Sequence, residues 1–323
     1  EPPDNTVDYS TLTFTLANPN ASTALTGVTF SDTLPDGLVV ANPPSVPLPF
    51  KCTSGTFTGT VTADAGSNIV SLTGGNLSAN ASGCTFSVRV QGKDSGSYTN
   101  TSNRIISAET GPNLTGGADV GYGTADLTVI ASPVISKAFG SSFIYTGETA
   151  TLSFAITNPN TGTDLTGVNF TDTLPTLPGN MVVASPATFS TSGCGTPTFS
   201  PVAGAGTVSF SNGTILAGET CYVTVDVTAP TDGTYENSVT ISSTNGGTGN
   251  TDEASLLVRA RNPAIDVVKQ VGPSPTGPWT SFYSVPSPLP QDVYFRFVVE
   301  NTGDTTLTIN LTNNLPVPTS VVI

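Results

Sequence analysis

The chain has 323 residues, of which 10% are charged and 37% are apolar, and its formal net charge is −14 with nine Lys and Arg and no His. So few cations argue against nucleic acid and anionic membrane surfaces as partners, and the lack of His removes the commonest general base and metal ligand. The length predicts two or three domains, and a chain rich in Thr, Val, Gly, Asn and Pro is typical of an all-β protein.

Internal repetition organises the chain. The stretch from Leu12 to Pro35, LTFTLANPNASTALTGVTFSDTLP, recurs without a gap from Leu152 to Pro175 as LSFAITNPNTGTDLTGVNFTDTLP. GSYTN at Gly96–Asn100 corresponds to GTYEN at Gly233–Asn237, and a third, shorter version of the motif begins at Tyr294. Short alternating runs bounded by Gly, Pro, Asn and Asp indicate about seven or eight strands per repeat, which predicts tandem immunoglobulin-like β-sandwich domains arranged end to end.

The repeats define three predicted domains. Residues 1–131 form a β-sandwich that lacks its first strand, residues 132–261 form a complete one, and residues 262–323 form the N-terminal part of a third. The middle repeat opens with PVISKAF from Pro133, whereas the residues before the motif of the first repeat match only the following loop. Either the chain is a piece of a longer one or another chain supplies the missing strands, since an open sheet edge is a template for strand addition. The very short linkers predict restricted hinging.

Four cysteines fall two per repeat at matching places: Cys52 and Cys84, then Cys194 and Cys221. An even count placed this way predicts one disulfide per domain and an oxidising compartment, and buried free thiols are the alternative. No apolar run reaches the roughly 18 residues of a membrane helix. We therefore expect an extracellular or cell-surface location without membrane insertion of this segment.

A Pro-rich insert interrupts the third repeat between its first two predicted strands. It reads GPSPTGPWTSFYSVPSPLP and contains Trp279, Phe282 and Tyr283. These aromatic side chains are predicted either to contact a neighbouring molecule or to form a flap over their own domain.

The repeated motif, with NPN or NTG followed by LTGVxFxDTLP and later GxYxN, resembles the conserved repeat domain of bacterial surface proteins, the eleventh domain-of-unknown-function class and its relatives. The resemblance implies arrays of repeats in large secreted or cell-wall-attached proteins of bacteria and some archaea. It implies an extracellular stalk, fibre or adhesin and no enzymatic activity. The third repeat departs from the pattern because Asn313 stands where the other repeats have Asp.

Strand parity places three polar side chains inside apolar stripes. Residues i and i+2 of a strand share a face. On this basis Lys137 shares a face with Ile135 and Phe139, Asp172 with Phe170 and Leu174, and Asn237 with Tyr235 and Val239. A buried amine and a buried carboxyl are costly unless they pair and form hydrogen bonds.

The three types of group together favour a covalent hypothesis. A desolvated Lys137 can act as a neutral amine nucleophile, a desolvated Asp172 can shuttle the proton, and Asn237 can be attacked with loss of ammonia. Surface proteins that resemble this one in architecture use such Lys–Asn isopeptide bonds. An ordinary buried polar triad and capping of turns by Asp and Asn are the competing interpretations.

The outer repeats hold incomplete sets. The first repeat has Asp32 and Asn100 but no Lys in a first strand, and the third has Lys269 but neither the Asp nor the partner strand. A neighbouring chain that inserted a Lys-bearing strand into the first repeat would produce covalent or strand-complemented polymers. Self-association and neighbouring domains of a longer chain are thus the expected partners.

The chain shows no GxSxG motif, no Cys beside a base and no Gly-rich phosphate loop on a helix, so we expect no enzyme. The leading interpretation is a structural stalk or filament subunit. The alternative is an adhesin that recognises glycan or a neighbouring or host surface protein through its end loops. No cofactor is expected, although the polar segment Ser242–Ala254, interpreted as a loop, permits Ca²⁺ binding.

Overall fold

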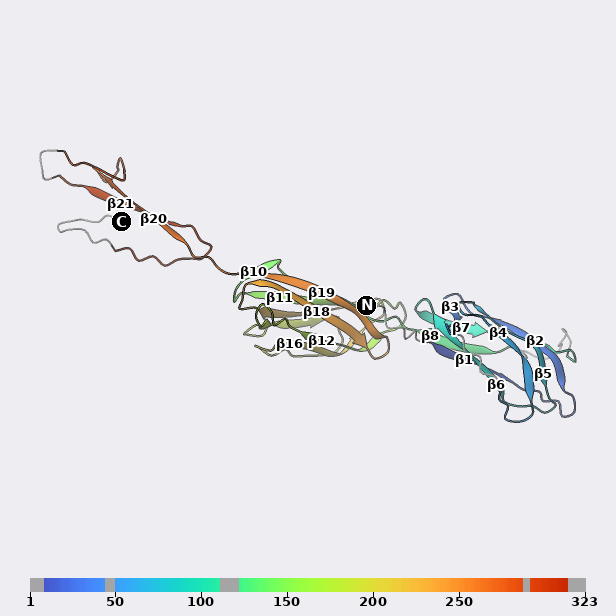
Figure 1. The fold of residues 1–323 in the computed structure, drawn as a ribbon. Coiled ribbons are helices and arrows are strands. Elements are labelled where there is room, and N and C mark those ends of the chain that lie inside the picture. The colour runs from blue at the N-terminus through green and yellow to red at the C-terminus, as the bar shows by residue number, and fades with distance from the viewer. Residues whose placement is uncertain (1–8, 44–49, 111–121, 287–290, 313–323) are drawn as a thin grey trace.

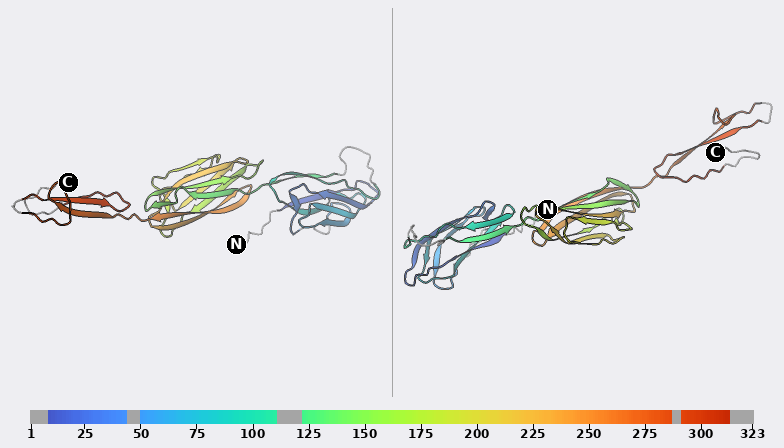
Figure 2. Two further views of the ribbon diagram at one scale, coloured as in Figure 1. Left: turned by 90° about the horizontal axis from the view of Figure 1, so that it is seen from above. Right: turned by 180° about the vertical axis from the view of Figure 1, so that it is seen from behind.

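The computed structural model describes residues 9–43, 50–110, 122–286 and 291–312, and the described residues form strands, turns and irregular segments without a helix. None of them lies in a helix long and apolar enough to cross a membrane. Three β-rich units follow one another along an elongated molecule (Figure 1). Two further views show the same succession of units (Figure 2). The all-β tandem arrangement predicted from the sequence is confirmed.

The middle repeat is a sandwich of two sheets. One sheet has the order β13-β17-β11-β9, with β14 also paired to β17. Its strands are β9 (Val134–Phe139), β11 (Thr149–Thr157), β13 (Val182–Val183), β14 (Phe189–Ser192) and β17 (Thr220–Thr228). The other sheet has the order β10-β19-β18-β12-β16-β15. Its strands are β10 (Phe143–Tyr145), β12 (Leu165–Thr173), β15 (Thr198–Phe199), β16 (Thr207–Ile215), β18 (Gly233–Ser243) and β19 (Gly247–Arg259).

Alternating side chains of both sheets make the core of the middle repeat. Phe154 of β11 lies 4.6 Å from Phe170 of β12 between ring centroids, and Phe170 stacks on Phe210 of β16 at 5.4 Å. Every second residue of β17 is buried, as the two-residue period of a strand requires. The disulfide between Cys194 and Cys221 joins β17 to the loop after β14.

The first repeat builds the same kind of sandwich from smaller sheets. One has the order β1-β6-β3, a second β2-β5-β4, and β7 and β8 form a hairpin. The strands are β1 (Ser10–Leu16), β2 (Leu25–Thr33), β3 (Leu38–Val40), β4 (Phe57–Ala63), β5 (Ile69–Leu77), β6 (Cys84–Gly92), β7 (Gly96–Thr101) and β8 (Thr124–Val129). Its disulfide joins Cys52 to Cys84, so both cysteine pairs lie within their own repeats as predicted.

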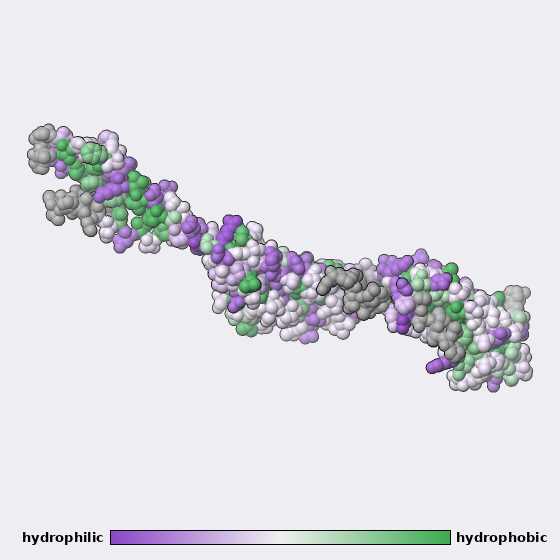
Figure 3. All heavy atoms as spheres, in the orientation of Figure 1, coloured by the Kyte–Doolittle hydropathy of each residue, from purple (hydrophilic) through white to green (hydrophobic). Residues whose placement is uncertain are grey.

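The third repeat is a two-stranded sheet of β20 (Ile265–Gly272) and β21 (Tyr294–Asn301) in the described residues. Without an opposing sheet there, Ile265, Val267 and Val298 are 48%, 48% and 42% exposed. Hydrophobic surface is accordingly visible on this unit in the space-filling view (Figure 3). Asn313 lies outside the described residues.

Two details of the prediction are wrong. The middle repeat has eleven strands rather than seven or eight, because short strands such as β13 and β15 form without an alternating pattern. Ser242–Ala254 is not a loop, because all but the turn at 244–246 belongs to the β18–β19 hairpin. In the described part of the chain, no group of three or more His, Cys, Asp or Glu side chains is placed to hold a metal ion.

The aromatic residues of the Pro-rich insert separate. Trp279 turns back onto its own repeat, where the guanidinium of Arg296 in β21 lies 5.2 Å from its ring centroid. Phe282 is 76% exposed and Tyr283 is partly buried. The flap interpretation therefore fits Trp279, and the described residues provide no cover for Phe282.

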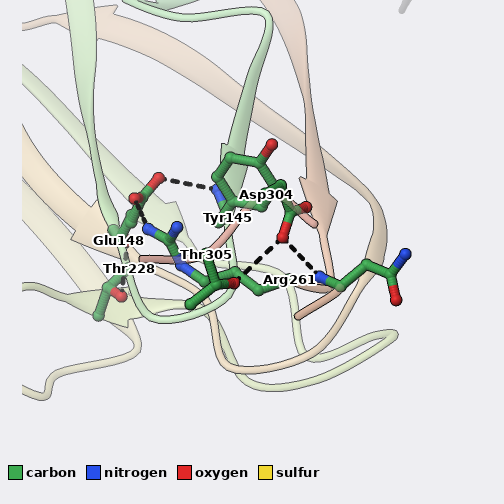
Figure 4. Close-up of polar contacts among 7 residues, drawn as sticks. Tyr145, Glu148, Thr228, Arg261, Asp304 and Thr305 are labelled. Carbon is green, nitrogen blue, oxygen red and sulfur yellow. Dashed lines mark hydrogen bonds and ion pairs between the residues drawn. The ribbon is translucent and has the colours of Figure 1, made fainter. Parts of the chain in front are cut away.

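Short linkers connect the units, and polar contacts hold them at both junctions. Arg261 forms an ion pair with Glu148 of the middle repeat, and its guanidinium lies 4.6 Å from the ring centroid of Tyr145. The next residue, Asn262, donates its backbone N–H to Asp304 of the third repeat at 2.7 Å (Figure 4). Adjacent linker residues are therefore tied to successive repeats.

The first linker is held by the second Asn of the NPN motif. Asn160 is 2% exposed and bonds both backbone groups of Ala131, accepting from its N–H at 2.7 Å and donating to its carbonyl at 2.9 Å. Asn158 positions Asn160 by accepting hydrogen bonds from its backbone and side-chain nitrogen atoms. The sequence pattern of the NPN motif does not by itself indicate this role.

Candidate crosslinking site

The residues that parity placed inside the middle repeat meet at one point. Lys137 lies on β9, Asp172 near the end of β12 and Asn237 on β18, so the three side chains connect both sheets. The Lys137 Nζ donates to Asp172 Oδ2 at 2.7 Å, and Asn237 Nδ2 donates to the same oxygen at 3.1 Å. A single carboxylate oxygen thus holds an amine and a carboxamide side by side.

The site is shielded from solvent. The side chains of Lys137 and Asp172 are fully buried, and Asn237 is 4% exposed. The Lys137 Nζ also lies 5.4 Å from the ring centroid of Phe154. Burial at this level removes water that would otherwise solvate the two charges.

Burial shifts both titrating groups toward their neutral forms. Desolvation raises the pKa of the Asp172 carboxyl, although the hydrogen bond from Lys137 opposes the shift. Desolvation likewise lowers the pKa of the Lys137 amine against the opposing effect of its bond to Asp172 and the charge of Asp252. Transfer of one proton from Lys137 to Asp172 would leave a neutral amine beside a carboxylic acid.

The backbone of β9 is held from the opposite sheet as well. Asn250 of β19 accepts from the N–H of Ile135 at 2.8 Å and donates to its carbonyl at 2.9 Å. Asp252 accepts from the N–H of Lys137 at 2.7 Å. These contacts hold β9 in one register against β19 and so fix where Lys137 lies in the sandwich. Nothing in the sequence pattern indicated a role for Asn250 or Asp252.

The first repeat contains the acid and the amide without the amine. Asn100 of β7 donates to Asp32 of β2 at 2.7 Å, and both residues are buried. Among the described residues, neither Asp32 Oδ1 nor Asn100 Oδ1 has a hydrogen-bond partner. Desolvation raises the pKa of the Asp32 carboxyl, while the bond from Asn100 opposes the shift.

Lys269 lies on β20, and its Nζ is 4.7 Å from the ring centroid of Phe295 on β21. β20 and β21 are the only described strands of the third repeat. Lys269 thus lies on the strand that corresponds to β9. The described residues of the third repeat contain no strand that corresponds to β12 or β18, which hold the acid and the amide in the middle repeat.

A family comparison matches the first two repeats. The sequence model of the family described as "Domain of unknown function (DUF7933)" matches residues 3–129 and 133–258. The relationship to the eleventh domain-of-unknown-function class stays a prediction. No curated protein matches the chain.

Similar solved structures are distant. The C-terminal domain of the Streptococcus agalactiae AgI/II polypeptide BspA has 11% identity and a TM-score of 0.42, over 77% of this chain and 100% of that one. The C-terminal domain of the Streptococcus pyogenes antigen I/II-family protein AspA has 11% identity and a TM-score of 0.40, over 76% and 99%. Likeness at this level carries no functional information.

Proposed function

Because the chain belongs to the DUF7933 family and contains two tandem copies of its domain, we propose that it is a structural element of an extracellular surface protein: a stalk or filament segment that spaces or displays other parts. Three features support this proposal: repeated sandwiches, linkers held by side chains at both junctions, and one disulfide in each of the first two repeats. Disulfides form and persist in oxidising compartments outside the cytosol.

The observation that carries the proposal is the buried contact of Lys137, Asp172 and Asn237. We infer that it matures into an isopeptide bond that joins β9 to β18. Neutral Lys137 Nζ attacks the side-chain carbonyl carbon of Asn237, and protonated Asp172 polarises the carboxamide. The new C–N bond forms as the bond to Nδ2 breaks, and ammonia leaves with one proton from the amine.

Such a bond suits an exposed structural protein. It would covalently join the two sheets across the core, whereas the disulfide between Cys194 and Cys221 closes a loop of only 27 residues at one end. A cross-link between distant parts of the sequence stabilises a fold by restricting the unfolded chain. The site consumes its own side chains, so it acts once and needs no substrate.

Accurate intact mass tests the proposal. One amide lowers the mass by about 17 Da relative to the sequence with two disulfides, and reduction returns only about 2 Da per disulfide. Lys137→Met and Asn237→Ala should each abolish the 17 Da deficit. A native chain with the full sequence mass apart from the disulfide hydrogens contradicts the crosslink.

The role as an adhesin through end loops stays a prediction. A glycan array probed with the whole chain tests it, because a spacer element should give no selective binding.

A further inference from the structure

A groove of about 220 Å³ runs along β1 in the first repeat, in the place that β9 occupies in the middle repeat. Its walls come from β1, including Leu12 and Phe14, and from residues around β8, including Tyr122 and Ala125. Asp32 and Asn100 both line it. The groove therefore leads directly to the buried acid and amide.

Matched residues show that this groove corresponds to a strand position. β1 pairs with β6 as β11 pairs with β17, but the other edge of β11 is covered by β9. No described strand pairs with the other edge of β1. Leu152 and Phe154 of β11 are consequently buried, whereas their counterparts Leu12 and Phe14 remain partly exposed.

The chemistry of the groove specifies one kind of residue. Asp32 is 1% exposed and Asn100 is 6% exposed, and among the described residues no Lys or Arg forms an ion pair with Asp32. In the middle repeat, Lys137 occupies the corresponding place and donates to the matching carboxylate. A cation on the central residue of an inserted strand would pair with Asp32 and offset the cost of burying it.

A linker site lies beside the strand site. Asn20 has the same arrangement as Asn160, with its backbone N–H and its side chain donating to Asn18 at 3.1 and 2.8 Å. Asn160 uses its remaining groups to hold the linker that enters β9, and it is buried by doing so. Asn20 is exposed. Its carboxamide is thus in position to hold the peptide that precedes an inserted strand.

We propose that the first repeat is an acceptor for a Lys-bearing first strand of another repeat of this family, and that Asn100 becomes covalently joined to that lysine. The inserted strand adds to the free edge of β1 with alternate apolar side chains facing inward, as Ile135 and Phe139 of β9 do. Its amine attacks the Asn100 carboxamide, a C–N bond replaces the bond to Nδ2, and ammonia leaves with one amine proton.

One difference between the repeats affects this step. Gly123 stands at the position of Asp252, so the inserted strand has no matching carboxylate for its backbone N–H. The inserted amine also lacks a counterpart of the Asp252 charge, which in the middle repeat opposes the lowering of the Lys137 pKa by desolvation. Noncovalent insertion is therefore expected to be weaker than in the middle repeat, while the neutral, nucleophilic amine is favoured.

This inference rests on the chemistry proposed for the middle repeat, and one experiment separates the two. The full chain is incubated with a synthetic peptide of residues 130–140, which contains Lys137, and the intact mass is followed with time. The expected product has the combined mass of chain and peptide less about 17 Da. The same peptide with Lys137→Met should bind reversibly and form no such product.

Chain variants locate the bond. Asn100→Ala and Asp32→Asn should abolish the covalent product, whereas Asn237→Ala should remove the 17 Da deficit of the chain alone and leave peptide coupling intact. A covalent ladder of the chain alone that requires both Lys269 and Asn100 would also support the acceptor role, with β20 of a second copy as the donor.

Absence of any complex at millimolar peptide would overturn the proposal. Reversible binding that depends on Asp32 but never leads to mass loss would support the strand site and overturn the covalent step. A missing deficit in the chain alone, with peptide coupling present, would instead count against the middle-repeat bond only.

Discussion

Replacing Asn237 with Ala should destabilise the middle repeat far more than Asn100→Ala destabilises the first. Before any crosslink forms, each of these carboxamides donates a buried hydrogen bond to an Asp, worth about 1.5–3 kcal/mol when the carboxyl is charged. Only Asn237→Ala also removes the proposed bond to Lys137, which closes a loop of about 100 residues and stabilises by roughly 4.7 kcal/mol in the chain-entropy treatment.

Differential scanning calorimetry of the full chain measures the contrast. A loss of 1 kcal/mol lowers the unfolding temperature of a domain of this size by about 3 °C. Loss of the crosslink should therefore lower the unfolding temperature of the middle repeat by roughly 15 °C more than loss of a hydrogen bond alone. Asn100→Ala should lower the unfolding temperature of the first repeat only by the effect of its lost hydrogen bond to Asp32. Equal decreases for the two matched variants would refute the inference that a covalent bond forms at Asn237.

Three further outcomes are expected. The raised pKa of Asp32 means that the folded first repeat binds more protons than the unfolded chain above pH 3.8, so its stability should fall as pH rises from there through the folded pKa, and Asp32→Asn should flatten this dependence in denaturant titrations. Reduction of the disulfides, which close loops of 32 and 27 residues, should lower the stability of each repeat by about 3–4 kcal/mol in urea unfolding with and without reductant. Asn160→Ala removes two hydrogen bonds to the linker and should speed proteolysis at residues 130–133, whereas the exposed Asn20→Ala should not.

The sequence predicts the candidate site well because both sheets are buried on one face. In such strands a two-residue period determines which side chains point inward, so the inward positions of Lys137, Asp172 and Asn237 follow from their apolar neighbours. The matched copies then indicate which strands meet. The same reasoning predicts the inward positions of Asp32 and Asn100, both buried in the structure.

Other features depend on contacts that periodicity does not encode. The two residues of β13 are too few to show alternation, and the start of β19 resembles a loop because its polar residues Thr248, Asn250 and Thr251 are exposed. The bond from Asn160 to Ala131 spans 29 positions. Only the folded chain shows which backbone group this carboxamide reaches.

The relative direction of the entry and exit strands has a mechanical consequence. Ile135 and Lys137 of β9 are held by Asn250 and Asp252 of β19, so the two strands run the same way from one junction of the middle repeat toward the other. Tension along the molecule would pull the start of β9 and the end of β19 in opposite directions and load these side-chain contacts in shear, all at once. A repeat loaded in this geometry resists extension better than one whose terminal strands peel apart bond by bond.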